Sequence, residues 1–167
     1  MKKEEQFNRL VEDNKERIKR ICSYYNSNTY DQEDMFQEIL VNIWKSLDSF
    51  RGDSSINTWI YRVAINTSLS YTDKAYKQMK MIVPANNYLL NSLLDDESLE
   101  AKKLQEQQLE NLQKELNLLS VIDKALISLL LEGLSMNEIA NVIGITESNV
   151  KVKIHRIKAQ LKTKLKE

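Results

Sequence analysis

The chain has 167 residues, with only 3 glycines and 1 proline, and its 24 Lys and Arg side chains equal its 24 Asp and Glu in number. Strands joined by tight turns need more glycine and proline, so the composition excludes a β-rich fold and predicts an all-α protein of one ordinary or two small domains. No apolar stretch approaches the roughly 18 residues of a membrane span, the polar start predicts no signal peptide, and the lone Cys22 fits a reducing, cytoplasmic setting.

The first half of the chain shows three helical patterns. A polar helix is predicted over residues 4–25, with Cys22 in its apolar phase, which favours a buried thiol over a reactive one. Asp31 is the predicted N-cap of a second helix that runs to Leu47, in which two apolar rows at i+4 spacing indicate a wide buried face. The small polar residues of 48–55 indicate a loop, and a third helix follows over 56–76.

The middle of the chain breaks the helical pattern. Pro84 and the residues after it begin an acidic, weakly periodic stretch, and a leucine repeat from Leu104 restarts a helix. We therefore predict an N-terminal domain at 1–78, a flexible linker with some helix at 79–104, and a C-terminal domain at 105–167.

The C-terminal domain contains the spacing of a helix-turn-helix. Ser135 and Glu138 form a predicted capping box that starts its first helix. Ala140 allows two helices to approach closely, Gly144 supplies the positive φ of a sharp turn, and Val150 packs the next helix back onto the first. These offsets predict a DNA-binding unit.

The last helix is predicted to begin after the cap Thr146 and to be basic on its open side. From Glu147 onward, seven Lys and Arg side chains stand against two carboxylates. Its apolar row is predicted to be buried at Val150, Ile154, Ile157, Leu161 and Leu165. The opposite face, which also includes Val152, offers candidate contacts to double-stranded DNA at Ser148, Asn149, Lys151, Lys153, His155 and Arg156. The alternative is a helical protein-interaction bundle with a solvated lysine-rich end.

Two stretches of the chain together resemble a known family. They are DQEDMFQEILVNIWKSLDSFRGDSSINTWIYRVAIN and LSVIDKALISLLLEGLSMNEIANVIGITESNVKVKIHRIKAQL. In this order, they resemble a bacterial RNA polymerase sigma factor of the extracytoplasmic-function group. The resemblance implies a protein that binds core RNA polymerase and directs promoter recognition, DNA melting and transcription initiation. It also implies an anti-sigma factor as a partner.

The resemblance implies a role for each region. The helix from Asp31 to Leu47 would contact core polymerase, with candidate residues Glu33, Asp34, Gln37, Glu38 and Asn42. The loop after it and the third helix would hold the melted minus-ten element, with candidate residues Phe50, Arg51, Asp53, Ser54, Asn57, Arg62, Asn66 and Lys74. The helix-turn-helix would read the minus-thirty-five element of promoter DNA. Trp59 has two readings, a stacking platform for a base or a core tryptophan.

Some features depart from the family, and other functions compete. After Asn66 the chain has fewer arginines than the family usually shows, and the proline-rich entry to the second domain is missing. A stand-alone helix-turn-helix regulator would explain the C-terminal half but leave 31–66 without a role. An enzyme is disfavoured because His155 is the only histidine and there is no phosphate-binding glycine loop. We therefore predict no catalytic residues, no metal and no cofactor.

Overall fold

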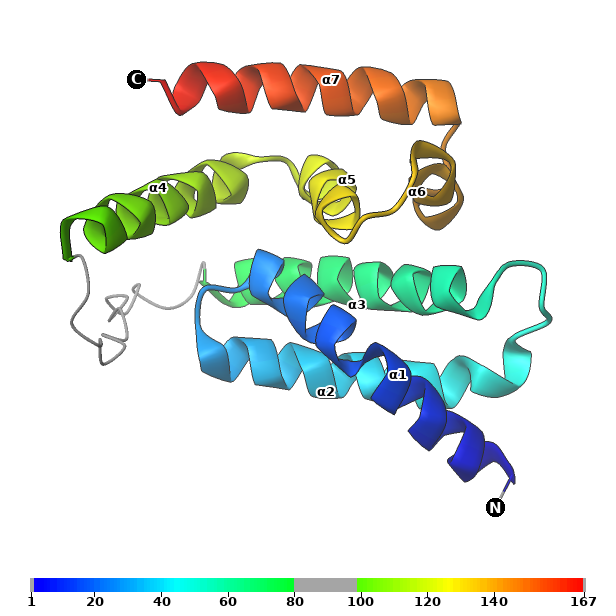
Figure 1. Ribbon diagram of the computed structural model, residues 1–167. Coiled ribbons are helices and arrows are strands. Elements are labelled where there is room, and N and C mark those ends of the chain that lie inside the picture. Colours follow the sequence, from blue (N-terminus) through cyan, green and yellow to red (C-terminus); the bar gives the residue numbers. More distant parts are fainter. Residues whose placement is uncertain (1, 80–98, 167) are drawn as a thin grey trace.

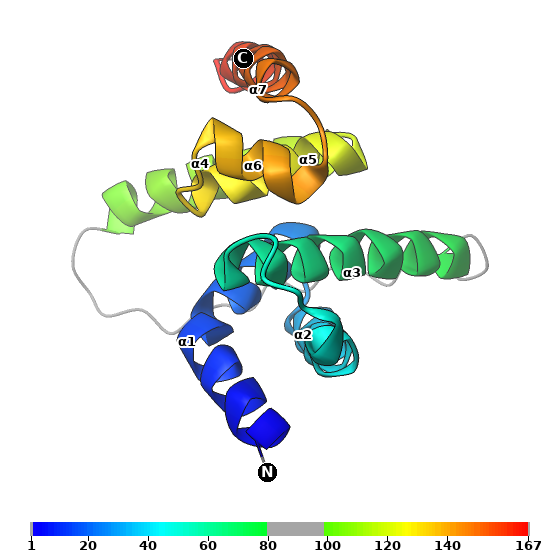
Figure 2. The same ribbon diagram turned by 90° about the vertical axis from the view of Figure 1, so that its right-hand side faces the viewer.

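The computed structural model describes residues 2–79 and 99–166, and every regular element within these two ranges is a helix, as predicted. The N-terminal elements are α1 (Lys2–Tyr25), α2 (Thr29–Ser46), the short 3-10 helix η1 (Leu47–Ser49) and α3 (Ile56–Met79). The C-terminal elements are α4 (Leu99–Leu118), α5 (Val121–Leu131), α6 (Met136–Ile143) and α7 (Glu147–Lys164). The two sets form two layers, with α7 outermost (Figures 1 and 2).

The N-terminal layer has the buried face that the i+4 spacing predicted on the second helix. Met35, Ile39 and Ile43 of α2 are fully buried, and they belong to one core cluster with Ile18 of α1 and Ile65 of α3. Burying such side chains contributes about 1.5–3 kcal/mol each relative to leaving them in water. This burial fixes the faces that α2 and α3 leave open.

Two predicted helix starts are wrong. Asn28, not Asp31, caps α2, because its side chain accepts a hydrogen bond from the Tyr30 backbone N–H over 2.8 Å. Asp31 lies in the first turn instead, where its charge faces the positive end of the helix dipole. Helix α4 begins at Leu99, inside the range predicted as linker, and most of that linker, residues 80–98, lies outside the described residues.

The helix-turn-helix has the predicted local structure. Both hydrogen bonds of the capping box are present, from the Ser135 N–H to the Glu138 carboxylate over 2.7 Å and from the Glu138 N–H to the Ser135 hydroxyl over 3.2 Å. Gly144 ends α6 in the left-handed region with a φ of 84°. The Thr146 hydroxyl caps α7 by accepting from the Asn149 N–H over 3.2 Å.

The buried row of α7 is shorter than predicted. Val150, Ile154 and Ile157 are buried and Leu161 is half-buried, but Leu165 is 46 % exposed. Leu165 follows the last residue of α7, beyond the elements that could cover it. The tertiary contacts of α7 therefore end about one turn before the helix does.

The two layers touch, which the sequence did not predict. Helix α5 packs against α1, and α6 packs against α3, so α5 and α6 lie between α7 and the N-terminal layer (Figure 1). Across the two described ranges, the helices are all too short or too polar to traverse a lipid bilayer.

Candidate polymerase and nucleic-acid interfaces

Helix α7 presents one polar and basic face to solvent. A helix turns about 100° per residue, so Ser148, Asn149, Val152 and Arg156 lie on the side opposite the buried row. All four are exposed, as is His155. Lys153 is half-buried because it lies at the edge of the contact with the rest of the domain. The face therefore combines hydrogen-bonding and cationic side chains with lysines at its margins, which suits the edges of base pairs between two phosphate rows.

Val152 lies at the centre of this face. Its side chain is 67 % exposed, although the neighbouring apolar residues Val150 and Ile154 are buried. Helical spacing predicts Val152 on this face, although it is not among the predicted DNA contacts. The signal that could have singled it out is its position almost diametrically opposite the buried row.

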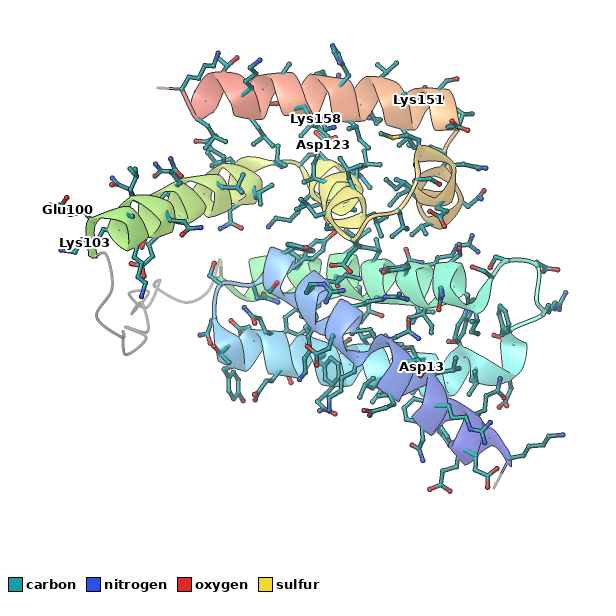
Figure 3. All side chains as sticks on the ribbon, viewed as in Figure 1. Asp13, Glu100, Lys103, Asp123, Lys151 and Lys158 are labelled. Atoms are coloured by element: carbon teal, nitrogen blue, oxygen red, sulfur yellow. The ribbon has the colours of Figure 1, made fainter. Side chains whose placement is uncertain are left out.

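Lys151 stands at the margin of the face near the start of α7, and Lys158 follows two turns later (Figure 3). The ammonium of Lys151 is 2.8 Å from the Glu147 carboxylate, one turn earlier on the same helix. Both side chains are exposed, so the pair is weak and Lys151 can exchange this partner for a phosphate.

The loop before α3 holds the first candidates for minus-ten contact. The rings of Phe50 and Trp59 lie 5.3 Å apart between centroids and are tilted by 49°, which anchors the loop to α3. Both rings are half-buried. Trp59 also packs against the core cluster, so part of its side chain is a core residue and part remains exposed. Arg51 and Asp53 are exposed beyond this ring pair, and Ser54 is half-buried.

The candidate minus-ten residues of helix α3 differ in their exposure and contacts. Asn57 and Asn66 are exposed, as contact with a DNA strand requires. Arg62 is half-buried, and its guanidinium donates a hydrogen bond of 2.6 Å to the Asn141 backbone carbonyl of α6. Arg62 is thus already hydrogen-bonded to another helix of the same molecule. The side chain of Lys74 is not among the described ones.

The candidate polymerase face of α2 is only partly as predicted. Glu33, Asp34 and Gln37 are exposed, and Glu38 is half-buried. The expectation that Asn42 faces outward is wrong, because its side-chain amide is half-buried and turned toward α3. Sequence spacing placed Asn42 beside the apolar rows but did not show that α3 packs across it.

Asp34 is connected to the third helix. The Tyr71 hydroxyl donates to the Asp34 carboxylate over 2.9 Å. Burial, together with this hydrogen bond, raises the pKa of Tyr71. The hydroxyl therefore stays protonated and keeps α3 attached to the open face of α2.

Metal-ligating groups are dispersed over the described ranges, where no three His, Cys, Asp or Glu side chains gather so that they could hold a metal ion. Cys22 is buried, as predicted, and burial raises the pKa of its thiol to about 12. The thiol is therefore protonated and unreactive at neutral pH.

Comparison with known proteins assigns a family to both layers. Residues 10–77 match the family model described as Sigma-70 region 2, and residues 109–161 match Sigma-70, region 4. The chain is 27 % identical to a protein named ECF RNA polymerase sigma-E factor from Haemophilus influenzae, over 95 % of this chain and 87 % of the relative. The protein of that name from Escherichia coli is also 27 % identical, over 95 % and 86 % of the two chains.

Solved structures share the fold. The sigma factor RpoE from Bartonella quintana, crystallised with the anti-sigma factor NepR, matches with a TM-score of 0.72 at 19 % identity, over 96 % of this chain and 97 % of its own. CnrH, solved with the cytosolic domain of CnrY, matches with a TM-score of 0.70 at 21 % identity, over 98 % and 89 %. The two matched regions, together with the named relatives, show that the chain belongs to the sigma-70 family of RNA polymerase sigma factors, in the extracytoplasmic-function group, and directs promoter recognition and transcription initiation.

Proposed function

We propose a division of this work between two domains of the chain. The domain at 1–78 binds core RNA polymerase through the open face of α2 and captures the melted minus-ten element through the loop before α3 and α3 itself. The domain at 105–167 reads the minus-thirty-five duplex, and 79–104 joins the two.

The observation that supports this division best is the exposed face of α7. Ser148, Asn149 and Arg156 are all open to solvent on the side opposite the buried row, within the first ten residues of the second helix of the helix-turn-helix. That is the part of such a unit that enters the major groove. Lys151 and Lys153 at the margins suit the phosphates on either side.

The minus-ten role is supported by the polar side chains that lie beside the Phe50–Trp59 ring pair. Arg51, Asp53 and Asn57 project from a loop and helix start that Phe50 and Trp59 hold in place. A flipped base needs such a combination of edge contacts and apolar surface to offset its unstacking. Because Phe50 is half-buried against Trp59, we assign it to the wall of this site.

We also propose the cellular location and the partners of the chain. We place it in the cytoplasm, where polymerase and DNA are found, and we assign it no catalytic group, metal or cofactor of its own. A solved sigma factor of the same fold was crystallised with an anti-sigma factor. That likeness supports a similar inhibitor here, and co-purification of the full chain with a cytoplasmic or membrane-tethered binding protein would test it.

Run-off transcription with core polymerase tests the central claim. Adding the full chain is expected to produce a transcript of defined start site from a cognate promoter, and Arg156→Ala is expected to reduce it. Lys162→Ala, which removes an exposed cation beyond the buried row of α7, is the matched control. A transcript unaffected by the chain, with tight promoter binding by the free protein, would favour the stand-alone regulator instead.

A further inference from the structure

Within the described part of the chain, the side-chain amide of Asn149 has no hydrogen-bond partner. Asn149 is the third residue of α7 and is exposed. Only its backbone N–H is engaged there, by donating to the Thr146 hydroxyl over 3.2 Å. The amide oxygen and nitrogen are therefore both available to a partner outside the molecule.

Comparable polar side chains of the same layer are already paired. The Asn141 amide of α6 donates to the Asn137 side-chain oxygen over 3.4 Å. The Glu132 carboxylate, at the C-cap of α5, is only 1 % exposed and accepts from the Arg20 guanidinium of α1 over 2.8 Å and 2.9 Å. Asn149 differs from both because α7 is the outermost helix and Asn149 lies on its exposed side (Figures 1 and 2).

The start of α7 holds this amide in a defined place. Gly144 turns the chain with a φ of 84°, and the Thr146 cap fixes the first turn of the helix. In a helix-turn-helix, the first residues of the second helix are those that reach the base edges in the major groove. Asn149 is therefore presented from a rigid backbone at the position where bases are read.

A carboxamide matches one base better than the others. It offers an acceptor oxygen beside a donor nitrogen. Adenine shows the complementary pair in the major groove, with its N6 amino group as donor and N7 as acceptor. Guanine shows two acceptors, which suit a guanidinium. Adenine is therefore the base that the free amide of Asn149 recognises through two hydrogen bonds.

Val152 restricts the neighbouring position. It follows Asn149 by three residues, so their Cβ atoms lie about 5–6 Å apart on the same side of the helix, and base pairs are stacked about 3.4 Å apart. The two side chains therefore meet the same base pair or adjacent ones. Val152 is 67 % exposed and apolar, and the thymine methyl is the apolar group of the major groove. A G·C pair would instead leave a polar edge without a partner.

We propose that Asn149 and Val152 together select an adenine and a thymine methyl within one base-pair step of each other, so that the minus-thirty-five element of this chain contains an A·T core. The inference rests on the proposed function of α7 and names the base pairs that this helix selects. Lys151 and Lys153, at the margins of the same face, contact phosphates and do not choose between bases.

A promoter library tests this selection with the full chain bound to core RNA polymerase. The minus-thirty-five window of a cognate promoter is randomised, and the templates that yield transcripts are sequenced. Wild type is expected to enrich adenine at one position by roughly 5- to 150-fold, the discrimination of one good bidentate contact. An A·T or T·A pair should be enriched at the same or the next position.

Substitutions of Asn149 should change this one preference and leave the others. Asn149→Ala should lose the adenine preference. Asn149→Asp should shift it toward cytosine, because a carboxylate accepts from the N4 amino group of that base. Asn111→Ala, which removes an exposed asparagine from α4, is the matched control and should select the wild-type sequences. Circular dichroism checks that each variant is folded, and Asn149→Asp is decisive should Asn149→Ala be unfolded.

A base analogue tests the contact without changing the protein fold. Replacing the selected adenine by 7-deazaadenine keeps the base pair but removes the N7 acceptor. Binding of the wild-type holoenzyme to this promoter should weaken by roughly 2- to 10-fold, as for the loss of one hydrogen bond. The Asn149→Ala holoenzyme should bind both promoters equally.

The inference and the proposed function would fail in different ways. An Asn149→Ala variant that keeps the adenine preference, or a wild-type chain that selects G·C pairs throughout the window, would overturn the A·T core while leaving α7 as the reader of this element. A library without enrichment at any position of the window would reject the proposed function of α7 itself, and the inference with it.

Discussion

The side-chain amide of Asn42 donates a hydrogen bond to the Thr67 hydroxyl over 3.0 Å, and this hydroxyl in turn donates to the Val63 carbonyl over 2.7 Å. Thr67 is buried, so the two bonds form a short polar chain between α2 and α3. A residue that spacing alone assigns to a polymerase-binding surface is thus a link between two helices.

Replacing Asn42 by alanine is therefore expected to affect stability first. The loss of one such bond should lower the free energy of unfolding by about 1 kcal/mol. Gln37→Ala, at an exposed position of the same helix, should leave stability unchanged and weaken the complex with core polymerase instead. Urea denaturation and a polymerase-binding titration separate the two effects, and equal stability of both variants would contradict the assignment.

Arg156 and Lys151 are expected to differ in what they contribute to duplex binding. Arg156→Ala should weaken binding to the minus-thirty-five element by about 1–3 kcal/mol and relax its preference at one position, as for a residue that contacts a base. Lys151→Ala should weaken binding to all sequences alike and reduce the salt dependence by about one phosphate contact. Titrations at several salt concentrations distinguish these patterns, and unaltered binding in both variants would mean that α7 docks by another face.

Val152 is expected to contact a thymine methyl group, because it is the one apolar side chain at the centre of an otherwise polar face. Replacing the contacted thymine by uracil removes only that methyl and should weaken wild-type binding about fourfold, in line with about 0.8 kcal/mol per buried carbon group. Val152→Ala should weaken binding similarly and become indifferent to the same replacement. Uracil scanning of a selected minus-thirty-five duplex measures this, and equal sensitivity in wild type and variant would refute the contact.

Gly144 is expected to tolerate no ordinary side chain without strain. A Cβ added there meets no atom within 4 Å, so space is available and only the φ of 84° opposes substitution. Gly144→Ala should destabilise the protein by about 1–2 kcal/mol, the usual penalty of this backbone region. Gly144→Asn should be milder because asparagine adopts the left-handed conformation more readily. Thermal or urea unfolding of both variants provides the comparison, and an asparagine variant no more stable than the alanine variant would argue against this cause.

The Cys22 thiol predicts a loss of stability in alkaline solution. Burial raises its pKa in the folded protein from 9.0 to about 12, so the unfolded chain releases this proton first. The contribution is complete below pH 9 and declines as the pH rises from about 9 to 12, by at most about 1.4 kcal/mol per pH unit. Cys22→Ala should show a shallower decline in urea denaturation over this range, although it starts from a lower stability because it leaves a small cavity. In addition, the native thiol should resist thiol reagents at pH 8 until the chain unfolds.

Much of the local structure could be predicted from residue order alone. Ser135 with Glu138, the glycine at 144 and the cap at 146 act on neighbours within a few residues, so their effects are visible in sequence. The buried row of α2 follows in the same way from the helical repeat, since a stripe of Met35, Ile39 and Ile43 can be covered only on one side. These local features, together with the two motif stretches, were enough to predict the all-α fold and the family.

The remaining features depend on contacts between residues far apart in the chain. Nothing in the sequence near Glu132 indicates that its carboxylate is buried, because the donor Arg20 lies 112 residues away. The inward turn of Asn42 and the engagement of Arg62 likewise depend on how α3 packs against α2 and α6. Local sequence determined which residues form helices and which side of each is apolar, whereas the tertiary structure decided which polar side chains remain free, because that depends on which helix lies opposite.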